Sequence, residues 1–440
     1  MFMKPEQVKE ILLTEIKKVA DNPYDFCFNP KTDFTRNRKI TLEKLMITII
    51  GMKSGSLTNE LLDAYDTSVH TPSASAFVQQ RSKLKPEAFE TVFRSFAKKL
   101  SSNPRDALHI LAIDGSDVQI ATDPKDASSY FPGANGQKPY NLLHLNAMYD
   151  LKHHVYLDAI IQKRHDWNEH KAFVEMVDRS AITKALVMAD RGYESYNNMA
   201  HVQEKGWNFL IRVKDGKNGI KAGLDLPEED SFDVDIHLKL TRRQTKDTKE
   251  LLKNRNRYRF IAVTTPFDYL ATKCRKYDPV EFYELHFRVV RFKISENTYE
   301  TILTNLNAKD YPVAKIKELY ASRWGIESSF RDLKYTLGML DFHSKKVMCI
   351  QQEIFAHLIM YNFAEMITSH VAIEKKQKKY TYKANFSVAA HICRLFYCGK
   401  TSPPDLETII ARNLIPVRPD RHRKRNSTTK VFHGFLYRVA

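Results

Sequence analysis

Cysteine is scarce in this sequence, and no two cysteines form a CxxC pair. The five that occur are scattered, without a histidine cluster at zinc-ligand spacing: Cys27, Cys274, Cys349, Cys393 and Cys398. This distribution argues against both a disulfide scaffold and a zinc site. We interpret the cysteines as reduced, mostly buried thiols, which are typical of a cytosolic protein.

Long hydrophobic runs are also missing. The first residues, Met-Phe-Met-Lys-Pro-Glu, contain no apolar signal core, and the longest apolar stretch, 354–367, is interrupted by His357, Asn362 and Glu365. A membrane-spanning helix needs about 20 consecutive apolar residues. We therefore expect a protein that is neither exported nor held in a membrane.

Negative charge is in short supply, and basic residues dominate. The 440 residues carry a formal net charge of +17, and residues 374–440 contain 15 Lys or Arg against 4 Asp or Glu. Nucleic acid is the commonest anionic partner for such a chain, while ribosomal, membrane-surface and acidic-protein binding stay open at this point. The basic tail fits either DNA contact or a solubilising segment. The length predicts two to four domains.

The first hundred residues predict helices. Apolar residues recur at helical spacing in 8–19, 42–52 and 89–100. The segment 73–84 begins with N-cap residues and, as a helix, would present Gln79, Gln80, Arg81 and Lys83 outward, in the manner of a DNA-reading helix. An ordinary solvated helix explains the same pattern.

Short apolar strands begin near residue 108. We expect strands at 109–114, 142–149, 155–161, 185–190 and 208–213, with helices at 171–179 and 196–205 between the later ones. Three strands followed by alternating helices and strands predict an α/β fold, with a mixed sheet flanked by helices. This order matches the start of a ribonuclease H-like core.

The alternation stops at residue 215. The following polar, β-rich segment is interpreted as an inserted subdomain, with strands at 287–294 and 299–303, and helices return at 313–332 and 351–372. The predicted order is a helical N-terminal DNA-binding domain, the first part of the core, the β-rich insertion, the second part of the core and a basic C-terminal region. Their ranges are 1–104, 105–214, 215–300, 301–373 and 374–440.

Two aspartates close predicted core strands. Asp114 follows the strand that begins at residue 109, and Asp190 closes the strand that begins at residue 185. Two such carboxylates on adjacent strand ends repel each other unless a cation lies between them. Glu327, from a helix, would complete a three-carboxylate site. Taken alone, each aspartate could equally be a turn or helix-cap residue.

Glu327 shares one helical face with three other polar residues. At about 100° per residue, Tyr320, Glu327 and Lys334 recur about 20° apart, and Arg323 lies about 60° to one side. A carboxylate among two cations and a phenol suits a helix that holds a divalent metal while gripping a phosphate backbone. The alternative is a salt-bridged surface helix, because i, i+4 pairs such as Glu327 with Arg331 are common.

Two aspartates and a glutamate are a sufficient ligand set for phosphodiester chemistry. Two Mg²⁺ ions about 3.5–4 Å apart can stabilise both the attacking and the leaving oxygen. Hard oxygen ligands suit Mg²⁺, and the missing His/Cys cluster argues against zinc. A further polar cluster, His165, Asp166 and Glu169, lacks another ligand at useful spacing, and we interpret it as surface or supporting residues.

Together these motifs resemble the DDE transposases of bacterial insertion sequences, in the group whose third block reads Tyr-x2-Arg-x3-Glu-x6-Lys. Tyr320, Arg323, Glu327 and Lys334 match that block at all four positions. The resemblance runs from about residue 35 to residue 425. Further family-like segments surround the aspartates and flank the third block: 113–116, 189–193, 209–212, 303–306 and 342–345.

The resemblance implies a ribonuclease H-like core with a β insertion between the second Asp and the Glu. It also implies that Asp114, Asp190 and Glu327 are catalytic and hold Mg²⁺, with Mn²⁺ as a substitute. Family members act as dimers that pair two transposon ends, nick DNA and join 3′-hydroxyls to target DNA. We thus expect a homodimer on double-stranded DNA, associated with the chromosome in the bacterial cytoplasm. The residues expected to contact DNA are Tyr320, Arg323, Lys334, Arg191, Arg212 and Arg331.

One departure concerns the cleavage route. Some relatives cleave through a DNA hairpin and stack a flipped base on a Trp in the insertion, whereas all three Trp residues of this chain lie outside 215–300. Phe267 or Tyr269 could substitute, because base–aromatic stacking, worth about 1–3 kcal/mol, tolerates different rings. Two alternative functions stay open: a Mg²⁺-dependent structure-selective nuclease on the same fold, and a catalytically silent DNA-binding repressor derived from a transposase.

Overall fold

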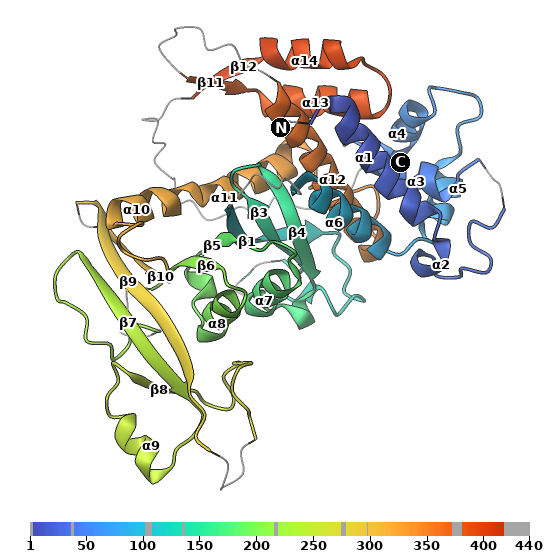
Figure 1. Ribbon diagram of the computed structural model, residues 1–440. Helices are drawn as coiled ribbons and strands as arrows, with labels where there is room; N and C mark the ends of the chain where they lie inside the picture. Colours follow the sequence, from blue (N-terminus) through green and yellow to red (C-terminus); the bar gives the residue numbers. More distant parts are fainter. Residues whose placement is uncertain are drawn as a thin grey trace.

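The protein is described by a computed structural model that covers most of the chain (Figure 1). The described residues are 3–36, 39–101, 108–133, 136, 138–214, 219–273, 279–296, 298–371 and 381–417. Within them, a large mixed sheet forms the centre, helices cover its two faces, and a long pair of strands projects to one side (Figure 1). The α/β class expected from the sequence is confirmed.

Helices precede the first strand, as the apolar periodicity predicts. They are α1 (Pro5–Ala20), α2 (Pro23–Phe26), α3 (Leu42–Gly51), α4 (Leu57–Ala64), α5 (Ala74–Arg81) and α6 (Glu87–Ser101). Three of them begin at a hydroxyl N-cap whose oxygen accepts a backbone N–H: Thr41 for α3, Ser56 for α4 and Ser73 for α5. The N-cap residues expected at the start of segment 73–84 are confirmed at Ser73, whereas those at Thr41 and Ser56 were not predicted.

The central sheet contains ten strands of the described chain. They are β1 (His109–Ile120), β2 (Tyr130–Phe131), β3 (Tyr140–Asp150), β4 (Val155–Gln162), β5 (Ala185–Ala189), β6 (Asn208–Arg212), β7 (Phe232–Thr241), β8 (Tyr258–Phe260), β9 (Tyr283–Ser295) and β10 (Thr298–Thr304). Their order is β2-β3-β1-β5-β6-β10-β9-β7-β8, and β4 pairs with β3. β1 is antiparallel to β3 and parallel to β5, and β5 is parallel to β6. This order is consistent with a ribonuclease H-like core.

Helices bury both faces of the sheet at its centre. Alternate residues of β1 point to opposite faces: Ala112 joins the core that contains α6 and α12 (Val347–His370), whereas Leu111 and Ile113 pack with α7 (Glu169–Arg179) and α8 (Tyr196–Glu204). A third apolar cluster lies between β5, β6 and α10 (Val313–Ser322). The strands β1 and β5 are therefore held from both sides, which gives a fixed platform for the residues at their ends.

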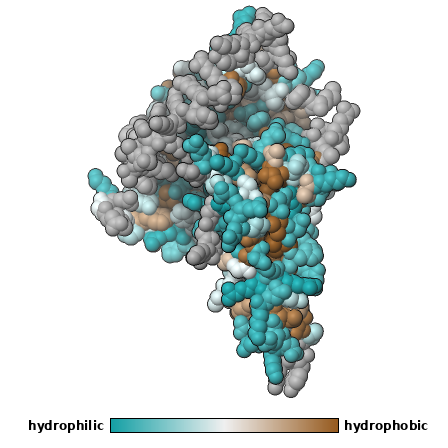
Figure 2. All heavy atoms as spheres, turned by 90° about the vertical axis from the view of Figure 1, so that its left-hand side faces the viewer, coloured by the Kyte–Doolittle hydropathy of each residue, from teal (hydrophilic) through white to brown (hydrophobic). Residues whose placement is uncertain are grey.

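The strands of the predicted insertion extend this same sheet. β9 pairs antiparallel with β7 along one edge and with β10 along the other. β7 and β9 project away from the helical part of the molecule, with β8 and α9 (Lys246–Leu251) toward their far end (Figure 1). The described surface on the side of the molecule where β7 and β9 lie is mostly hydrophilic, with some hydrophobic patches (Figure 2). The domain boundaries given above stay predictions.

A buried ion pair joins the early helices to α12. Arg81, the last residue of α5, is 1% exposed, and its Nη1 lies 2.7 Å from Glu353 Oε1. Its Nε and Nη2 donate to Gln352 Oε1 and to the Cys349 carbonyl oxygen. The prediction that Arg81 points outward from a DNA-reading helix is therefore wrong. A charged side chain is buried here because its partner, far away in the sequence, supplies the opposite charge.

Two more helices follow α12 near the end of the described chain. They are α13 (Phe386–Tyr397) and α14 (Pro403–Arg412), flanked by the paired strands β11 (Thr381–Ala384) and β12 (Leu414–Val417). Much of the basic C-terminal cluster, including Arg421 and Arg423, lies outside the described residues. Among the described residues, no helix combines the length and the apolar character that crossing a membrane requires.

Candidate active site

Asp114 and Asp190 lie side by side on adjacent parallel strands. The ladder between β1 and β5 ends at the pair Ile113 and Ala189, and each aspartate is the next residue. β5 stops there, but β1 continues to Ile120 because β3 pairs with its other edge up to that residue. The prediction that Asp114 closes its strand is therefore wrong, whereas Asp190 does follow the end of β5.

A helix anchored at the end of β5 brings the third carboxylate, Glu327, to the aspartates. The single helix expected over 313–332 consists of α10 and α11 (Trp324–Arg331), which meet at Arg323. Tyr320, near the end of α10, is buried, and its hydroxyl donates to the Ala189 carbonyl oxygen at 3.4 Å. This contact fixes the helix against the strand that precedes the second aspartate.

Arg323 is the cation among the carboxylates. Its Nη2 lies 2.9 Å from Glu327 Oε1, and its Nη1 lies 3.6 Å from Asp114 Oδ2. The side chain is 1% exposed, and its guanidinium lies 5.7 Å and 5.3 Å from the ring centres of Tyr320 and Trp324. Its Nε and Nη1 find no hydrogen-bond partner within the described chain. A buried guanidinium in this position supplies the positive charge that adjacent carboxylates require.

The three carboxylates act on one another electrostatically. Burial raises the pKa of Asp114 to about 6, against the opposing effect of Arg323, and the charges of Glu327 and Asp190 add to the rise. All three side chains are partly open to solvent, with exposed fractions of 21% for Asp114, 32% for Asp190 and 36% for Glu327. Reachable carboxylates with surplus negative charge and only oxygen donors fit a hard divalent cation such as Mg²⁺.

Arg212 holds Asp190 in place. Its Nε and Nη2 lie 2.8 Å and 2.6 Å from Asp190 Oδ1, and its Nη1 lies 3.2 Å from Glu300 Oε1. Burial acts to raise the pKa of Asp190, but the Arg191 backbone N–H and the Arg212 side chain outweigh it, and the pKa is lowered. Asp190 therefore stays charged, and its second oxygen, Oδ2, accepts none of these contacts.

Lys334 is carried by a π-helical turn, Asp332–Thr336, which continues α11. Its Nζ donates to the Asp117 carbonyl oxygen at 2.8 Å, on β1 three residues beyond Asp114. π-helical turns are rare and often lie at functional sites. Arg191, next to Asp190, and Arg331, at the end of α11, are both exposed. The predicted basic residues thus differ in exposure: Arg323 is buried, Arg212 and Lys334 are half-buried, and Arg191 and Arg331 are exposed.

Glu169, interpreted above as a surface or supporting residue, lies beside β1 at Gly115 and beside the turn after β5 at Gly192. A Cβ added to Gly115 would lie 3.1 Å from Glu169 Oε1, and one added to Gly192 would lie 3.6 Å from Oε2. His144 of β3 lies between two carboxylates, with Nδ1 2.8 Å from Asp117 Oδ1 and Nε2 3.0 Å from Glu169 Oε1. The available sequence signal was that α7 follows the three antiparallel strands and begins with a carboxylate.

Aromatic residues near the site differ in exposure. Trp167 is 39% exposed and stacks on His144 with ring centres 4.5 Å apart, whereas Trp207 is buried in the core. Of the two residues considered for base stacking, Phe267 is 3% exposed within the core. The Tyr269 hydroxyl lies 3.1 Å from His201 Nδ1. Phe267 therefore presents no free ring face to a base in this conformation.

Among the described residues, the group of three possible metal ligands whose ligand atoms all lie within 4.8 Å of one another is His109, Asp150 and His153 at the start of β1, and Asp114, Asp190 and Glu327 do not form so tight a group in this conformation. The two histidine Nδ1 atoms lie 2.7 Å and 2.9 Å from the same oxygen of Asp150. The other oxygen accepts the backbone N–H groups of Lys152 and His153. This carboxylate is thus saturated by hydrogen bonds that close the turn after β3, and the cluster fits a structural network.

An open groove of about 730 Å³ begins beside the second aspartate. It runs between the start of α7, the start of α8 and the segment 265–268. Three cationic residues line it: Arg191, Lys171 and Lys214. Two acidic residues, Glu194 and Asp268, line it as well, so the lining carries only a small excess of positive charge.

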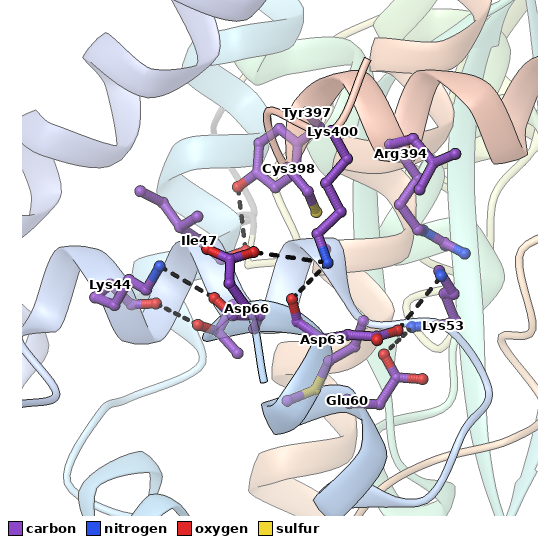
Figure 3. A pocket seen from close by; sticks show the side chains of 15 residues that line it. Lys44, Ile47, Lys53, Glu60, Asp63, Asp66, Arg394, Tyr397, Cys398 and Lys400 are labelled. Carbon is purple, nitrogen blue, oxygen red and sulfur yellow. Dashed lines mark hydrogen bonds and ion pairs between the residues drawn. The ribbon is translucent and has the colours of Figure 1, made fainter. Parts of the chain in front are cut away.

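A smaller cavity of about 140 Å³ lies between α3, α4 and α13 (Figure 3). Lys400 Nζ donates to the Asp63 carbonyl oxygen at 2.7 Å, which joins the end of α13 to α4. Glu60 accepts the backbone N–H groups of Lys53 and Gly55. The lining of this cavity contains none of the three predicted catalytic carboxylates. We therefore assign this cavity to the packing between early and late helices.

Comparison with known proteins identifies the family. Residues 107–363, more than half of the chain, match the family described as Transposase DDE domain. The chain is 21% identical over 341 residues to the transposase InsG for insertion sequence element IS4 of Escherichia coli (strain K12), covering 74% of this chain and 70% of that protein. A piggyBac transposase synaptic complex with hairpin DNA aligns with a TM-score of 0.47 and 12% identity, covering 97% of this chain and 88% of that one. The chain belongs to the transposase DDE domain family, in agreement with the predicted resemblance to the DDE transposases of bacterial insertion sequences.

Proposed function

We propose that this protein binds the terminal inverted repeats of an insertion sequence, cleaves the DNA backbone and joins the 3′-hydroxyl ends to target DNA. The observation that carries the proposal is that Asp114 and Glu327 pair with the buried Arg323 while Asp190, on the strand next to Asp114, pairs with Arg212, in a chain of the transposase DDE domain family. We further assign the chain to the Tyr-x2-Arg-x3-Glu-x6-Lys group, with a ribonuclease H-like core interrupted by a β-rich insertion.

Asp114, Asp190 and Glu327 would hold Mg²⁺, with Mn²⁺ as a substitute. Bound there, two divalent ions would activate the attacking oxygen and stabilise the leaving oxygen of the phosphodiester. The protein's own residues keep the ligands in position. Arg212 orients Asp190, and Tyr320 fixes the helix that carries the glutamate.

Arg323 has a double role in this proposal. In the structure its guanidinium balances the carboxylates and is buried. Once the carboxylate charge is balanced by other cations, its unpaired Nε and Nη1 donors become available to a DNA phosphate. The predicted DNA contact of Arg323, and of Tyr320 beside it, therefore requires that this part of the site rearranges on binding.

The remaining proposed DNA contacts are made by four cationic residues. Arg191 lines the groove beside the second aspartate and is exposed, as is Arg331 on α11. Lys334 and Arg212 lie closer to the carboxylates. We propose that these four cations hold double-stranded DNA across the site, and that two copies of the chain pair two transposon ends as a homodimer.

A strand-joining assay tests the proposal and separates it from its alternatives. The protein is incubated with Mg²⁺, a DNA fragment that carries the inverted repeats flanking its gene, and a target plasmid. A transposase yields fragments covalently joined to the plasmid. A structure-selective nuclease would yield cut DNA without joined products, and a silent repressor would only bind the fragment.

A further inference from the structure

Glu169 stands where a fourth ligand of the active site would stand. We infer that its carboxylate binds a divalent cation together with Asp114 and Asp190, an inference that rests on the proposed divalent-ion function of those aspartates. Glu169 is the first residue of α7, and its side chain is 33% exposed. The carboxylate is therefore accessible to ions from solvent.

The two glycines that follow the aspartates open the way for this carboxylate. Gly115 comes directly after Asp114, and Gly192 comes two residues after Asp190. An added Cβ would meet Glu169 Oε1 at 3.1 Å in the first case and Oε2 at 3.6 Å in the second. Oε1 thus faces β1, and Oε2 faces the turn after β5. A side chain at Gly115 would crowd this space, whereas a Cβ at Gly192 would make only an ordinary van der Waals contact.

His144 holds Glu169 in this position. The imidazole is 4% exposed, and its ring lies flat on Trp167. Its Nδ1 is anchored on Asp117, while Nε2 lies 3.0 Å from Glu169 Oε1 at ion-pair distance, without the geometry of a hydrogen bond. The contact restrains one oxygen and leaves Oε2 available as a ligand. Buried partners of this kind commonly orient metal-binding carboxylates.

Tyr193 gives a second, independent indication. Its hydroxyl is buried, with 2% of the residue exposed, and it has no hydrogen-bond partner among the residues that the structure describes. Burial raises the pKa of this phenol, the charges of Glu169, Asp114 and Asp190 add to the rise, and Arg323 opposes it. The unpaired hydroxyl therefore lies within electrostatic reach of these carboxylates. Buried hydroxyls normally have a partner, and the water ligands that Mg²⁺ retains would provide one.

The test is a Mn²⁺ titration of the full chain without DNA, in which electron paramagnetic resonance measures the free ion. Glu169→Gln should weaken Mn²⁺ binding at least tenfold, and Glu169→Asp, which keeps the charge but shortens the reach, should also weaken it. Glu175→Gln is the matched control, because Glu175 lies on the same helix and pairs with Arg179. It should bind Mn²⁺ like the unaltered protein.

The outcomes separate this inference from the proposed function. Normal Mn²⁺ binding by both Glu169 variants, with binding lost in Glu327→Gln, would overturn the inference and leave the proposed function intact. Failure of the unaltered protein to bind Mn²⁺ would overturn both. DNA nicking gives a second readout: Glu169→Gln should need at least tenfold more Mn²⁺ for half-maximal rate. A lower rate with the same Mn²⁺ midpoint would mean a purely structural role and would also overturn the inference.

Discussion

Asp114 and Asp190 each lie one residue beyond the last rung, Ile113 to Ala189, that joins β1 to β5. Their separation is thus set by backbone hydrogen bonds of the sheet and not by a loop. Neighbouring strands lie about 4.7–4.9 Å apart, which is suitable for two carboxylates that share cations. Arg323 bridges Glu327 to Asp114, so the helix brings a third carboxylate to a preformed pair.

The space beside Gly115 gives the first prediction. A Cβ there would lie 2.3 Å from His144 Nε2, a distance that forces the imidazole to move, whereas a Cβ at Gly192 meets Glu169 Oε2 at an ordinary 3.6 Å. Gly115→Ala should therefore lower the nicking rate at least tenfold, and Gly192→Ala should change it little. The two rates are compared at saturating Mg²⁺. Equal activity of both variants would show that the contact with His144 is unimportant.

Arg323 as a counter-charge gives the second prediction. Arg323→Met should lower stability in a chelating buffer by about 1–3 kcal/mol, the usual effect of leaving buried polar groups unpaired. Mg²⁺ should restore more stability to this variant than to the unaltered protein, because in the variant no guanidinium competes with Mg²⁺ for the carboxylates. Thermal melts with and without Mg²⁺ measure this. The exposed Arg331→Met serves as control, and equal Mg²⁺ shifts in all three proteins would refute the counter-charge role.

The third prediction concerns the pH dependence of stability. Burial acts to raise the pKa of Glu353, but Arg81 and the hydrogen bond with His343 lower it from 4.5 to about 2. A depressed carboxylate pKa stabilises the fold above the unfolded value and loses this effect as the pH falls through the folded value. Glu353→Gln should therefore be less stable at pH 7, by about 3–5 kcal/mol as for other broken buried pairs. The difference in melting temperature should shrink between pH 4.5 and pH 2; a difference that does not change with pH would contradict the account.

Salt dependence gives the fourth prediction. With about 6–10 phosphate contacts, affinity for the transposon ends should fall about 10³–10⁵-fold between 50 and 200 mM salt. Fluorescence anisotropy of labelled end DNA measures the decline. A flat response would remove the argument that the basic surface binds DNA by charge.

Much of the core could be predicted because its signals are local. The apolar strands and the periodic helices alternate in sequence, and the structure places β3, β4, β5 and β6 within one or two residues of the expected ranges. Asp190 could be placed at a strand end because β5 is short and apolar. The end of β1 could not, because Gly115 and Ser116 resemble a turn locally, and only the pairing of β3 across the sheet continues the strand.

Long-range contacts explain the other differences. Arg81 has the polarity of a surface residue, and its burial depends on Glu353, which lies 272 residues later in the chain. Glu169 had no ligand partner at useful sequence spacing, since its neighbours Gly115 and Gly192 come from two other segments. Such residues become visible only when the sheet brings the start of α7 to the same edge as the aspartates.

The role of Glu327 is the most direct test of the central claim. Glu327→Gln keeps the shape of the side chain and its contact with Arg323 but removes the negative charge that a divalent ion requires. The measurement is Mg²⁺-dependent nicking of DNA bearing the flanking inverted repeats, alongside binding of the same DNA. We predict normal binding and no nicking by the variant. Nicking by Glu327→Gln at the rate of the unaltered protein would contradict the account.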